Sequence, residues 1–253
     1  STPQNRLDLT IQIPKEENQG AVPLEGRTVD RGAPSLKVKD LTAMVFPGQG
    51  SQYVNMLAGW RSEKSFQQVL ETAERIFARV NQESLLGYVY PVAKDPADEA
   101  LREKQELMLQ NTLVAQPAIF TMSAGLLEVA RGRGMSCDLV LGHSLGEYSA
   151  LYAAGVFSLE DALNAVCIRG RYMTAIPGPD LGCMGIVALP EKNVVEILGA
   201  VTGYVVCANL NSPTQTVISG ETAAVEEAIK RFSAKGVTAR RLNVSAAFHS
   251  NIV

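Results

Sequence analysis

Apolar residues follow two different rhythms along this chain. In the first two thirds they recur every three or four positions, which is the period of one helix face. Four stretches carry this pattern and are expected to be helices: 66–80, 99–109, 112–130 and 158–174. Two short apolar runs, 41–46 and 139–141, predict buried strands within this part.

After residue 177 the rhythm changes to short strands that alternate with short helices. Strands are expected at 183–189, 204–209, 215–219 and 237–244, and helices at 190–200 and 221–235. The order β-α-β-β-α-β within about sixty residues is typical of a ferredoxin-like unit. The predicted fold class is therefore α/β, with a hydrolase-like main body that has a short parallel sheet, and an inserted ferredoxin-like (β-α-β-β-α-β) subdomain.

The same pattern suggests the domain boundaries. The main body is expected over 40–180 and 244–253, and the ferredoxin-like subdomain over 181–243. Residues 1–39 hold four prolines and mixed charges without a helical or strand period, so they are predicted to be a linker or tail.

Composition narrows the class of protein. Apolar residues make up 46% and charged residues 19% of the chain, which suits a packed core. A net charge of −3 does not favour nucleic acid or an anionic membrane as partner. No uninterrupted apolar run approaches the ~18 residues of a membrane span, and no signal-peptide pattern opens the chain. We expect a cytoplasmic protein.

The chain has four cysteines, Cys137, Cys167, Cys183 and Cys207. They show no C-x-x-C spacing, and three of the four have apolar neighbours. Buried free thiols fit this pattern better than a disulfide or a metal site. No metal is therefore expected.

Gly142-His143-Ser144-Leu145-Gly146 forms a G-x-S-x-G motif between a predicted strand and a small-residue helix at 148–154. This context is that of a nucleophile elbow, in which a tight turn exposes the serine at a helix N-terminus. The two glycines leave room for the turn. Ser144 is thus a candidate nucleophile.

A serine nucleophile needs a base, and the chain contains two histidines. His143 is adjacent to Ser144, but neighbouring side chains in a tight elbow point apart, so a packing or turn-stabilising role fits it better. His249 follows the last predicted strand and is free to reach the serine. We therefore expect His249 to be the catalytic base.

Arg169 and Arg171 lie on the helix after the elbow. The apolar pattern of this helix puts Arg169 at the border of its buried face and Arg171 further outward. A guanidinium turned inward is costly unless it meets an anion, and an acyl group with its own carboxylate would supply one. Two solvent-exposed arginines remain the alternative.

The segment 47–52, Pro-Gly-Gln-Gly-Ser-Gln, follows the first predicted strand. It matches neither the phosphate-binding loop, since no lysine follows, nor G-x-G-x-x-G. It is either a glycine-rich turn or a source of exposed backbone N–H groups for an oxyanion hole.

Taken together, five segments resemble the malonyl-CoA:acyl carrier protein transacylase family, which includes the acyltransferase domains of polyketide and polyunsaturated fatty acid synthases. The likeness runs from about Thr42 to the end of the chain, in the family's order and spacing. The segments are 45–52, 142–148, Arg169-Gly170, 209–220 and 247–250.

The resemblance implies a ping-pong transfer of a malonyl group from coenzyme A to the phosphopantetheine thiol of an acyl carrier protein, in fatty acid or polyketide biosynthesis. Ser144 would be the nucleophile and His249 the base. The backbone N–H groups of Gln49 and Leu145 would form the oxyanion hole, and Arg169 would hold the malonyl carboxylate.

The resemblance also bears on selectivity and partners. Phe248 resembles malonyl-selecting members, whereas methylmalonyl-selecting ones tend to carry serine there, and Asn209 is expected at the substrate. The coenzyme A thioester is the substrate, and no bound cofactor is expected. The expected partners are malonyl-CoA, the carrier protein and, within a megasynthase, neighbouring synthase domains.

One departure concerns the C-terminus. Family members continue for several tens of residues past the histidine, with a further strand and helix, and a backbone carbonyl from that stretch orients the histidine. This chain ends at Val253, shortly after His249. We therefore expect either that the C-terminal part of the main body is missing from this chain or that a second chain completes it.

Two other classes are weighed against the transferase. An α/β-hydrolase, an esterase or thioesterase, would need an Asp or Glu between Ser144 and His249, and no motif supports one. Such an enzyme has no need of a buried Arg169 either. A non-catalytic carrier-protein docking module is opposed by the intact Ser144, Arg169 and His249.

Overall fold

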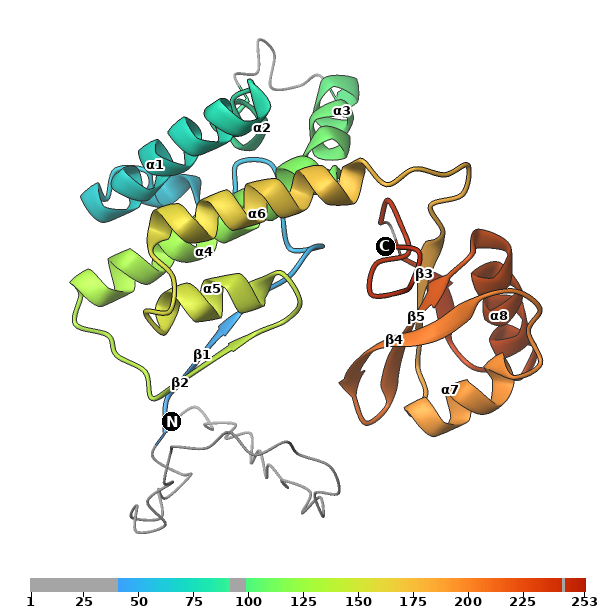
Figure 1. The fold of residues 1–253 in the computed structure, drawn as a ribbon. Helices are drawn as coiled ribbons and strands as arrows, with labels where there is room; N and C mark the ends of the chain where they lie inside the picture. The colour runs from blue at the N-terminus through green and yellow to red at the C-terminus, as the bar shows by residue number, and fades with distance from the viewer. Residues whose placement is uncertain (1–40, 92–98, 243) are drawn as a thin grey trace, which may run out of the picture. The chain divides into compact units, whose positions relative to one another are not determined.

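The computed structural model describes residues 41–91, 99–242 and 244–253 (Figure 1). The linker or tail predicted over 1–39 lies outside these residues. The elements form two groups, a helical α/β body and an antiparallel sheet with two helices.

Three long helices form the core of the body. They are α1 (Lys64–Asn81), α4 (Thr112–Gly132) and α6 (Leu159–Thr174), and each contacts the other two. Their shared interior is close-packed and apolar, because α1 turns one apolar face inward and α4 is buried around most of its circumference. Fully buried aromatic and aliphatic side chains fill it, among them Phe66, Phe77, Phe120 and Leu163.

Shorter helices complete the helical part. They are the 3-10 helix η2 (Ala58–Trp60), α2 (Leu85–Val89) and α3 (Glu99–Gln110). The sequence pattern predicts α3 but neither η2 nor α2, because elements of three and five residues are too short to repeat an apolar period.

The sheet of the body consists of two parallel strands, β1 (Ala43–Phe46) and β2 (Leu139–Gly142), followed by α5 (Gly146–Ala153). Met44, Phe46 and Val140 pack on the α4 and α5 side. On the other face Val45 and Leu141, which pair in register, are 70% and 53% exposed. This sheet therefore has one buried face and one open apolar face.

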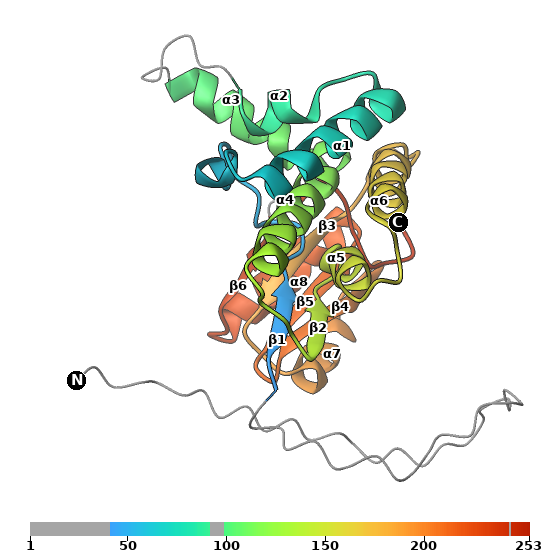
Figure 2. The same ribbon diagram turned by 90° about the vertical axis from the view of Figure 1, so that its left-hand side faces the viewer.

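The second sheet has four strands, all paired antiparallel in the order β4-β5-β3-β6. Along the chain its elements run β3 (Cys183–Val187), α7 (Glu191–Leu198), β4 (Val205–Ser212), β5 (Gln215–Gly220), α8 (Thr222–Ala234) and β6 (Ala239–Arg241). This is the β-α-β-β-α-β order expected from the sequence. The last strand is shorter than the predicted 237–244. Figure 2 shows both sheets after a 90° turn.

Alternate residues of these strands face opposite sides of the sheet, as strand geometry requires. Val187 and Ile218 pack with Phe232 under α7 and α8. Met184 and Val217 face the other way and contact Phe248 of the C-terminal segment 244–253. The sheet is thus covered on both faces, and the C-terminal segment covers the second one.

Hydrogen bonds fasten the C-terminal segment to this sheet. Ser219 Oγ donates to the Phe248 carbonyl oxygen over 2.7 Å, and the Ala247 N–H donates to the Leu181 carbonyl oxygen over 2.8 Å. A Cβ on Gly182 would lie 2.6 Å from the Ala247 Cβ, so only glycine allows this approach. The residues around His249 are therefore held firmly.

Helix α4 also bears on the expectation that no segment could cross a membrane. By length and hydropathy α4 alone among the helices of the described residues could do so, although 72% of the relevant window is buried inside the protein. An uninterrupted apolar run, on which the expectation rested, is too strict a criterion. Burial of this degree is typical of a core helix.

Candidate active site

Ser144 lies at a strained turn between β2 and α5. Its φ of +52° is in the left-handed region, which non-glycine residues rarely adopt. A Cβ on Gly142 would collide with the backbone of Glu147, and one on Gly146 would collide with the Phe46 carbonyl oxygen. The steric role predicted for the two glycines is confirmed, and the turn presents Ser144 before the first turn of α5.

His249 reaches Ser144 from the far end of the chain. Ser144 Oγ and His249 Nε2 are 2.8 Å apart, a hydrogen bond across 105 residues of sequence. With the ring proton on Nδ1, Nε2 accepts the serine O–H. His249 has a φ of +57°, and its neighbour Ser250 fixes the turn by donating to the Ala247 carbonyl oxygen over 2.6 Å.

The electrostatics of His249 favour a neutral imidazole. Although the residue as a whole is exposed, part of its ring is not. This burial and the positive charge of Arg169 lower the pKa of His249 from its ordinary value. His143 acts in the same direction, and the carboxylate of Glu147 opposes them. A lowered pKa leaves the ring free to take a proton at neutral pH.

Arg169 is half-buried on α6, whereas Arg171 is exposed, as the apolar pattern predicts. Arg169 Nη1 donates to Gln116 Oε1, and its guanidinium carbon lies 5.9 Å from the centre of the Tyr148 ring. Among the described residues Arg169 forms no ion pair with a carboxylate. Burial lowers its pKa, and Tyr148 and Glu147 oppose this. A half-buried guanidinium without an acidic partner is suited to binding an anion.

The loop after β1 approaches the elbow closely. A Cβ on Gly48 would lie 2.6 Å from the His143 carbonyl oxygen, so glycine is needed there. Within the part of the chain that the structure describes, the backbone N–H groups of Gln49 and Leu145 donate to no protein acceptor. Both are therefore available to an oxyanion, as predicted for a hole beside Ser144.

The other sequence-predicted residues lie in different settings. Phe248 is buried against the antiparallel sheet, next to His249. Asn209 is partly buried in β4, and its side chain makes no hydrogen bond to the rest of the described chain. Asn211, two residues along, has its Oδ1 3.0 Å from His143 Nε2. His143 thus meets a residue of the antiparallel sheet, and its packing or turn-stabilising role stays a prediction.

Two buried polar residues of α4 escaped the sequence analysis. Gln116 and Thr112 are 0% and 1% exposed, and both belong to hydrogen bonds that extend from Arg169 to the side chain of Gln49. The sequence does contain a signal for them, because Thr112 and Gln116 are two polar residues four positions apart in the otherwise apolar stretch 112–120.

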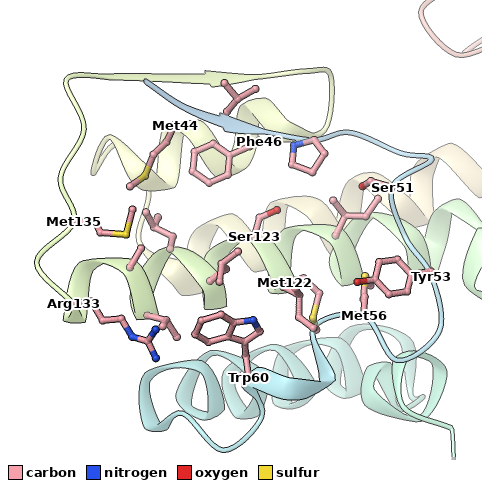
Figure 3. A pocket seen from close by; sticks show the side chains of 18 residues that line it. Met44, Phe46, Ser51, Tyr53, Met56, Trp60, Met122, Ser123, Arg133 and Met135 are labelled. Carbon is pink, nitrogen blue, oxygen red and sulfur yellow. The ribbon is translucent and has the colours of Figure 1, made fainter. Parts of the chain in front are cut away.

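A separate cavity of about 500 Å³ lies between β1, α4 and the η2 region (Figure 3). Its lining is mostly apolar, with Met44, Trp60 and Met122 pointing into it, and Arg133 stacks over the Trp60 ring at 4.8 Å. Neither Ser144 nor His249 lines it, so the chemistry of the site does not use this cavity.

The described residues contain no group of three or more His, Cys, Asp or Glu side chains that could hold a metal ion. All four cysteines are free, and burial raises the pKa of Cys167, Cys183 and Cys207. These thiols are poor nucleophiles, so Ser144 is the better candidate.

Comparison with known proteins identifies the family. The family model "Acyl transferase domain" matches residues 43–253. The chain is 40% identical over 214 residues to the malonyl CoA-acyl carrier protein transacylase of Synechocystis sp., covering 84% of this chain and 65% of that protein. It is 36% identical over 217 residues to the phenolphthiocerol synthesis polyketide synthase Pks15/1 of Mycobacterium marinum, covering 84% of this chain and 9% of that synthase.

Solved structures of acyltransferases also resemble this chain. The acyltransferase domain from the second module of the salinomycin polyketide synthase superposes with a TM-score of 0.71 at 34% identity, over 84% of this chain and 46% of that one. A malonyl-transacylase solved in complex with its type II polyketide synthase acyl carrier protein gives 0.70 at 33%, over 83% and 65%. The resemblance predicted from five sequence segments is confirmed, and the chain belongs to the acyl transferase domain family.

Proposed function

We propose that this chain moves a malonyl group from coenzyme A to the phosphopantetheine thiol of an acyl carrier protein through an acyl-Ser144 intermediate. The observation that carries the proposal is Arg169, a half-buried cation without a carboxylate partner in the described chain, beside a serine hydrogen-bonded to a histidine. A simple hydrolase has no use for such a cation, whereas a carboxylated acyl group needs one.

In the first half-reaction the Ser144 hydroxyl gives its proton to His249 Nε2 while Oγ attacks the thioester carbon. The carbonyl oxygen becomes an oxyanion that accepts hydrogen bonds from the backbone N–H groups of Gln49 and Leu145. The carbon–sulfur bond then breaks, and the departing coenzyme A sulfur takes the proton from His249. Malonyl-Ser144 remains.

The second half-reaction reverses these roles. The carrier-protein thiol gives its proton to His249 and its sulfur attacks the ester carbon of malonyl-Ser144. The carbon–oxygen bond breaks, and Ser144 Oγ recovers the proton from His249. The same oxyanion donors serve both steps. No bound cofactor takes part; coenzyme A enters only as the thioester substrate.

Selectivity follows from the groups that face the acyl chain. Arg169 would bind the malonyl carboxylate through the N–H groups that Gln116 leaves free. Phe248 would disfavour the extra methyl of methylmalonyl, and Asn209 would contact the substrate. Two relatives support malonyl as the acyl group and an acyl carrier protein as the partner: the Synechocystis malonyl transacylase, and the malonyl-transacylase solved together with its carrier protein.

The context of the chain is part of the proposal. The chain spans less than a tenth of the first polyketide synthases it matches, 8% and 9% of their lengths, but 65% of the Synechocystis transacylase. Neighbouring synthase domains are therefore proposed as partners. We also propose that the protein is cytoplasmic. We assign residues 181–243 as a ferredoxin-like subdomain, an assignment that the strand order β4-β5-β3-β6 supports.

The hydrolase alternative lacks support in the site. An esterase of the α/β-hydrolase type orients its histidine with an Asp or Glu. In the described part of the chain no carboxylate is hydrogen-bonded to His249. A non-catalytic docking module has no reason to keep a 2.8 Å contact between Ser144 and His249.

The test is acylation of the purified protein by malonyl-CoA, followed by mass spectrometry of the peptide that contains Ser144. We expect a malonyl adduct that persists in water and is discharged by carrier protein bearing its phosphopantetheine arm. Rapid loss of the adduct to water would instead identify a thioesterase, and no adduct at all would refute the proposal.

Arg169→Ala provides the matched test of acyl choice. Only malonyl offers a carboxylate, so this variant is expected to lower kcat/KM for malonyl loading by about tenfold to a hundredfold and to affect acetyl loading far less. Arg169→Lys keeps the charge and serves as control. Equal losses for both acyl groups would remove Arg169 from this role.

A further inference from the structure

A chain of hydrogen bonds crosses the body behind the site. Gln49 Nε2 donates to Thr112 Oγ1 over 2.9 Å, and Gln116 Nε2 donates to the same oxygen over 2.8 Å. Gln116 Oε1 in turn accepts from Arg169 Nη1. Three segments far apart in sequence, the loop after β1, the first turns of α4, and α6, are thereby joined through two side chains on α4.

The geometry fixes which way the Gln116 amide points. Arginine has donors only, so the group that meets Arg169 must be the amide oxygen. The amide nitrogen then faces Thr112 Oγ1 and, at 3.3 Å, Met173 Sδ. Because Gln116 is 0% exposed, water cannot replace these partners. The buried amide is thus locked, and it locks one arm of the guanidinium.

The side chain that Arg169 meets, the Gln116 amide, carries no charge. A buried arginine is ordinarily neutralised by a carboxylate. Here a neutral amide orients Arg169 without neutralising its positive charge. The Tyr148 ring, whose centre is 5.9 Å from the guanidinium carbon, adds only weak attraction. Glutamate at position 116 would have nearly the same shape but would neutralise the charge of Arg169 by forming an ion pair with it. The glutamine therefore holds a cation ready for an external anion.

The other end of the chain of bonds reaches the oxyanion loop. Thr112 accepts from the side chain of Gln49, the residue whose backbone N–H is left without a protein acceptor in the described chain. A side chain tied to the first turn of α4 limits how that loop can move. The position of the N–H group and the position of Arg169 therefore depend on one shared oxygen, Thr112 Oγ1.

We propose that Gln116 and Thr112 are positioning residues that link the carboxylate-binding Arg169 to the oxyanion loop at Gln49, so that acyl selection and transition-state stabilisation are held as one unit. The inference rests on the proposed function and names how its site selects the acyl group. Neither residue touches the substrate; both act through Arg169 and Gln49.

The first test changes charge at nearly constant shape. Gln116→Glu pairs with Arg169 and cancels its charge, so kcat/KM for malonyl loading falls about tenfold to a hundredfold, chiefly through KM. Acetyl loading falls less than about threefold, because it uses no carboxylate contact. A malonyl-to-acetyl ratio that stays as in the wild type, in a variant with an unchanged unfolding transition, overturns the role of Gln116.

The second test removes the shared oxygen. Thr112→Val is nearly isosteric and frees the Gln49 side chain, so it lowers kcat for both acyl groups by about threefold to tenfold. It also removes the oxygen that accepts from the Gln116 amide, so malonyl loading should fall further than acetyl loading. Thr112→Ser keeps the hydroxyl and restores kcat. If valine and serine behave alike, or if only KM changes, Thr112 does not hold the oxyanion loop.

A double-mutant cycle tests the link itself. Gln116→Glu combined with Thr112→Val should depart from the product of the single effects by more than about threefold, because both changes act on one network. Independent, multiplicative effects overturn the proposed coupling even where each single variant behaves as expected.

Failure of the linkage and failure of the proposed function are distinguishable. A wild-type protein that forms no malonyl-Ser144 refutes the function; one that loads malonyl selectively, with selectivity intact in Gln116→Glu, refutes the linkage alone. Binding gives a readout without chemistry. In a Ser144→Ala background, calorimetry should find malonyl-CoA affinity reduced by Gln116→Glu and acetyl-CoA affinity unchanged; equal affinities for malonyl-CoA with and without the substitution would contradict the linkage.

Discussion

The two parts of the molecule hold their reactive groups by different means. The α/β body holds Ser144 through its backbone: a φ of +52°, with glycines at 142 and 146 where any side chain would collide. The antiparallel sheet holds His249 through packing, with Phe248 buried on one face and Ser219 bonded to its carbonyl oxygen. The position of Ser144 therefore depends on local sequence, whereas the position of His249 depends on contacts between distant segments.

Substitutions around Ser144 and substitutions around His249 should therefore have different effects on the protein. A change in the elbow strains the fold of the body. A change beneath the C-terminal segment displaces the histidine while the fold survives. At the site, the hydrogen bonds from Ser144 to His249 and from His143 to Asn211 join the two regions, so a displacement of either region disturbs these contacts.

The largest effect is expected from His249→Ala, which removes the base but leaves the elbow intact. Loading of Ser144 should slow by about 10²- to 10⁴-fold, the usual contribution of general base catalysis. The rate is measured by quenching the acylation reaction at set times and following the Ser144 adduct by mass spectrometry. Ser144→Ala, which forms no adduct, is the negative control. A loss below tenfold would mean that another group takes the serine proton.

Gly142→Ala tests the body. The added methyl collides with the backbone of Glu147, so the free energy of unfolding should fall by about 1–3 kcal/mol or more. Denaturant unfolding measures this. Gly59→Ala is the control, because a Cβ there meets nothing within 4 Å. Equal stability of the two variants would show that the elbow tolerates side chains and is not fixed by its glycines.

Ser219→Ala tests the sheet. It removes the hydrogen bond to the Phe248 carbonyl oxygen, which costs about 1 kcal/mol and frees the segment that carries His249. We expect kcat to fall about threefold to tenfold for malonyl and acetyl alike, with KM unchanged. The exposed Ser233→Ala serves as control. An effect on malonyl alone would contradict this view of the segment.

The smallest effect concerns pH and connects the two regions. Burial and, after it, the Arg169 charge lower the pKa of His249, so the imidazole is neutral, and active as a base, down to a lower pH than usual. In Arg169→Ala that pKa rises, and the acid limb of acetyl loading should move to higher pH; Arg169→Lys should leave it in place. A limb that does not move in the alanine variant would place Arg169 too far from His249 to act on it.

Several features could be predicted from sequence because they depend on neighbouring residues. The elbow follows from two glycines around Ser144, the long helices from their apolar period, and the half-burial of Arg169 from its place on α6. The choice of His249 followed by elimination, since His143 cannot turn back on Ser144. Hydrogen bonding between His249 and Ser144 confirms that these two residues meet.

Other features could not be predicted because they arise between segments. The contact between Asn211 and His143 is one example, because the shifted register of β4 against β5 near these residues is not visible in sequence. The place of Asn209 at the substrate stays a prediction. Gln116 and Thr112 looked like ordinary polar residues in a buried helix. Their significance lies in what α6 and the loop after β1 bring to them.

The sequence by itself indicated the family and the candidate nucleophile, base and arginine, because short motifs with steric requirements carry these signals. Only the tertiary structure decided how the base is held and what orients the arginine. A hydrogen bond such as Ser219 to Phe248 or Gln116 to Arg169 joins residues far apart along the chain. The free energy of such contacts depends on burial and alignment, which exist only once the chain has folded.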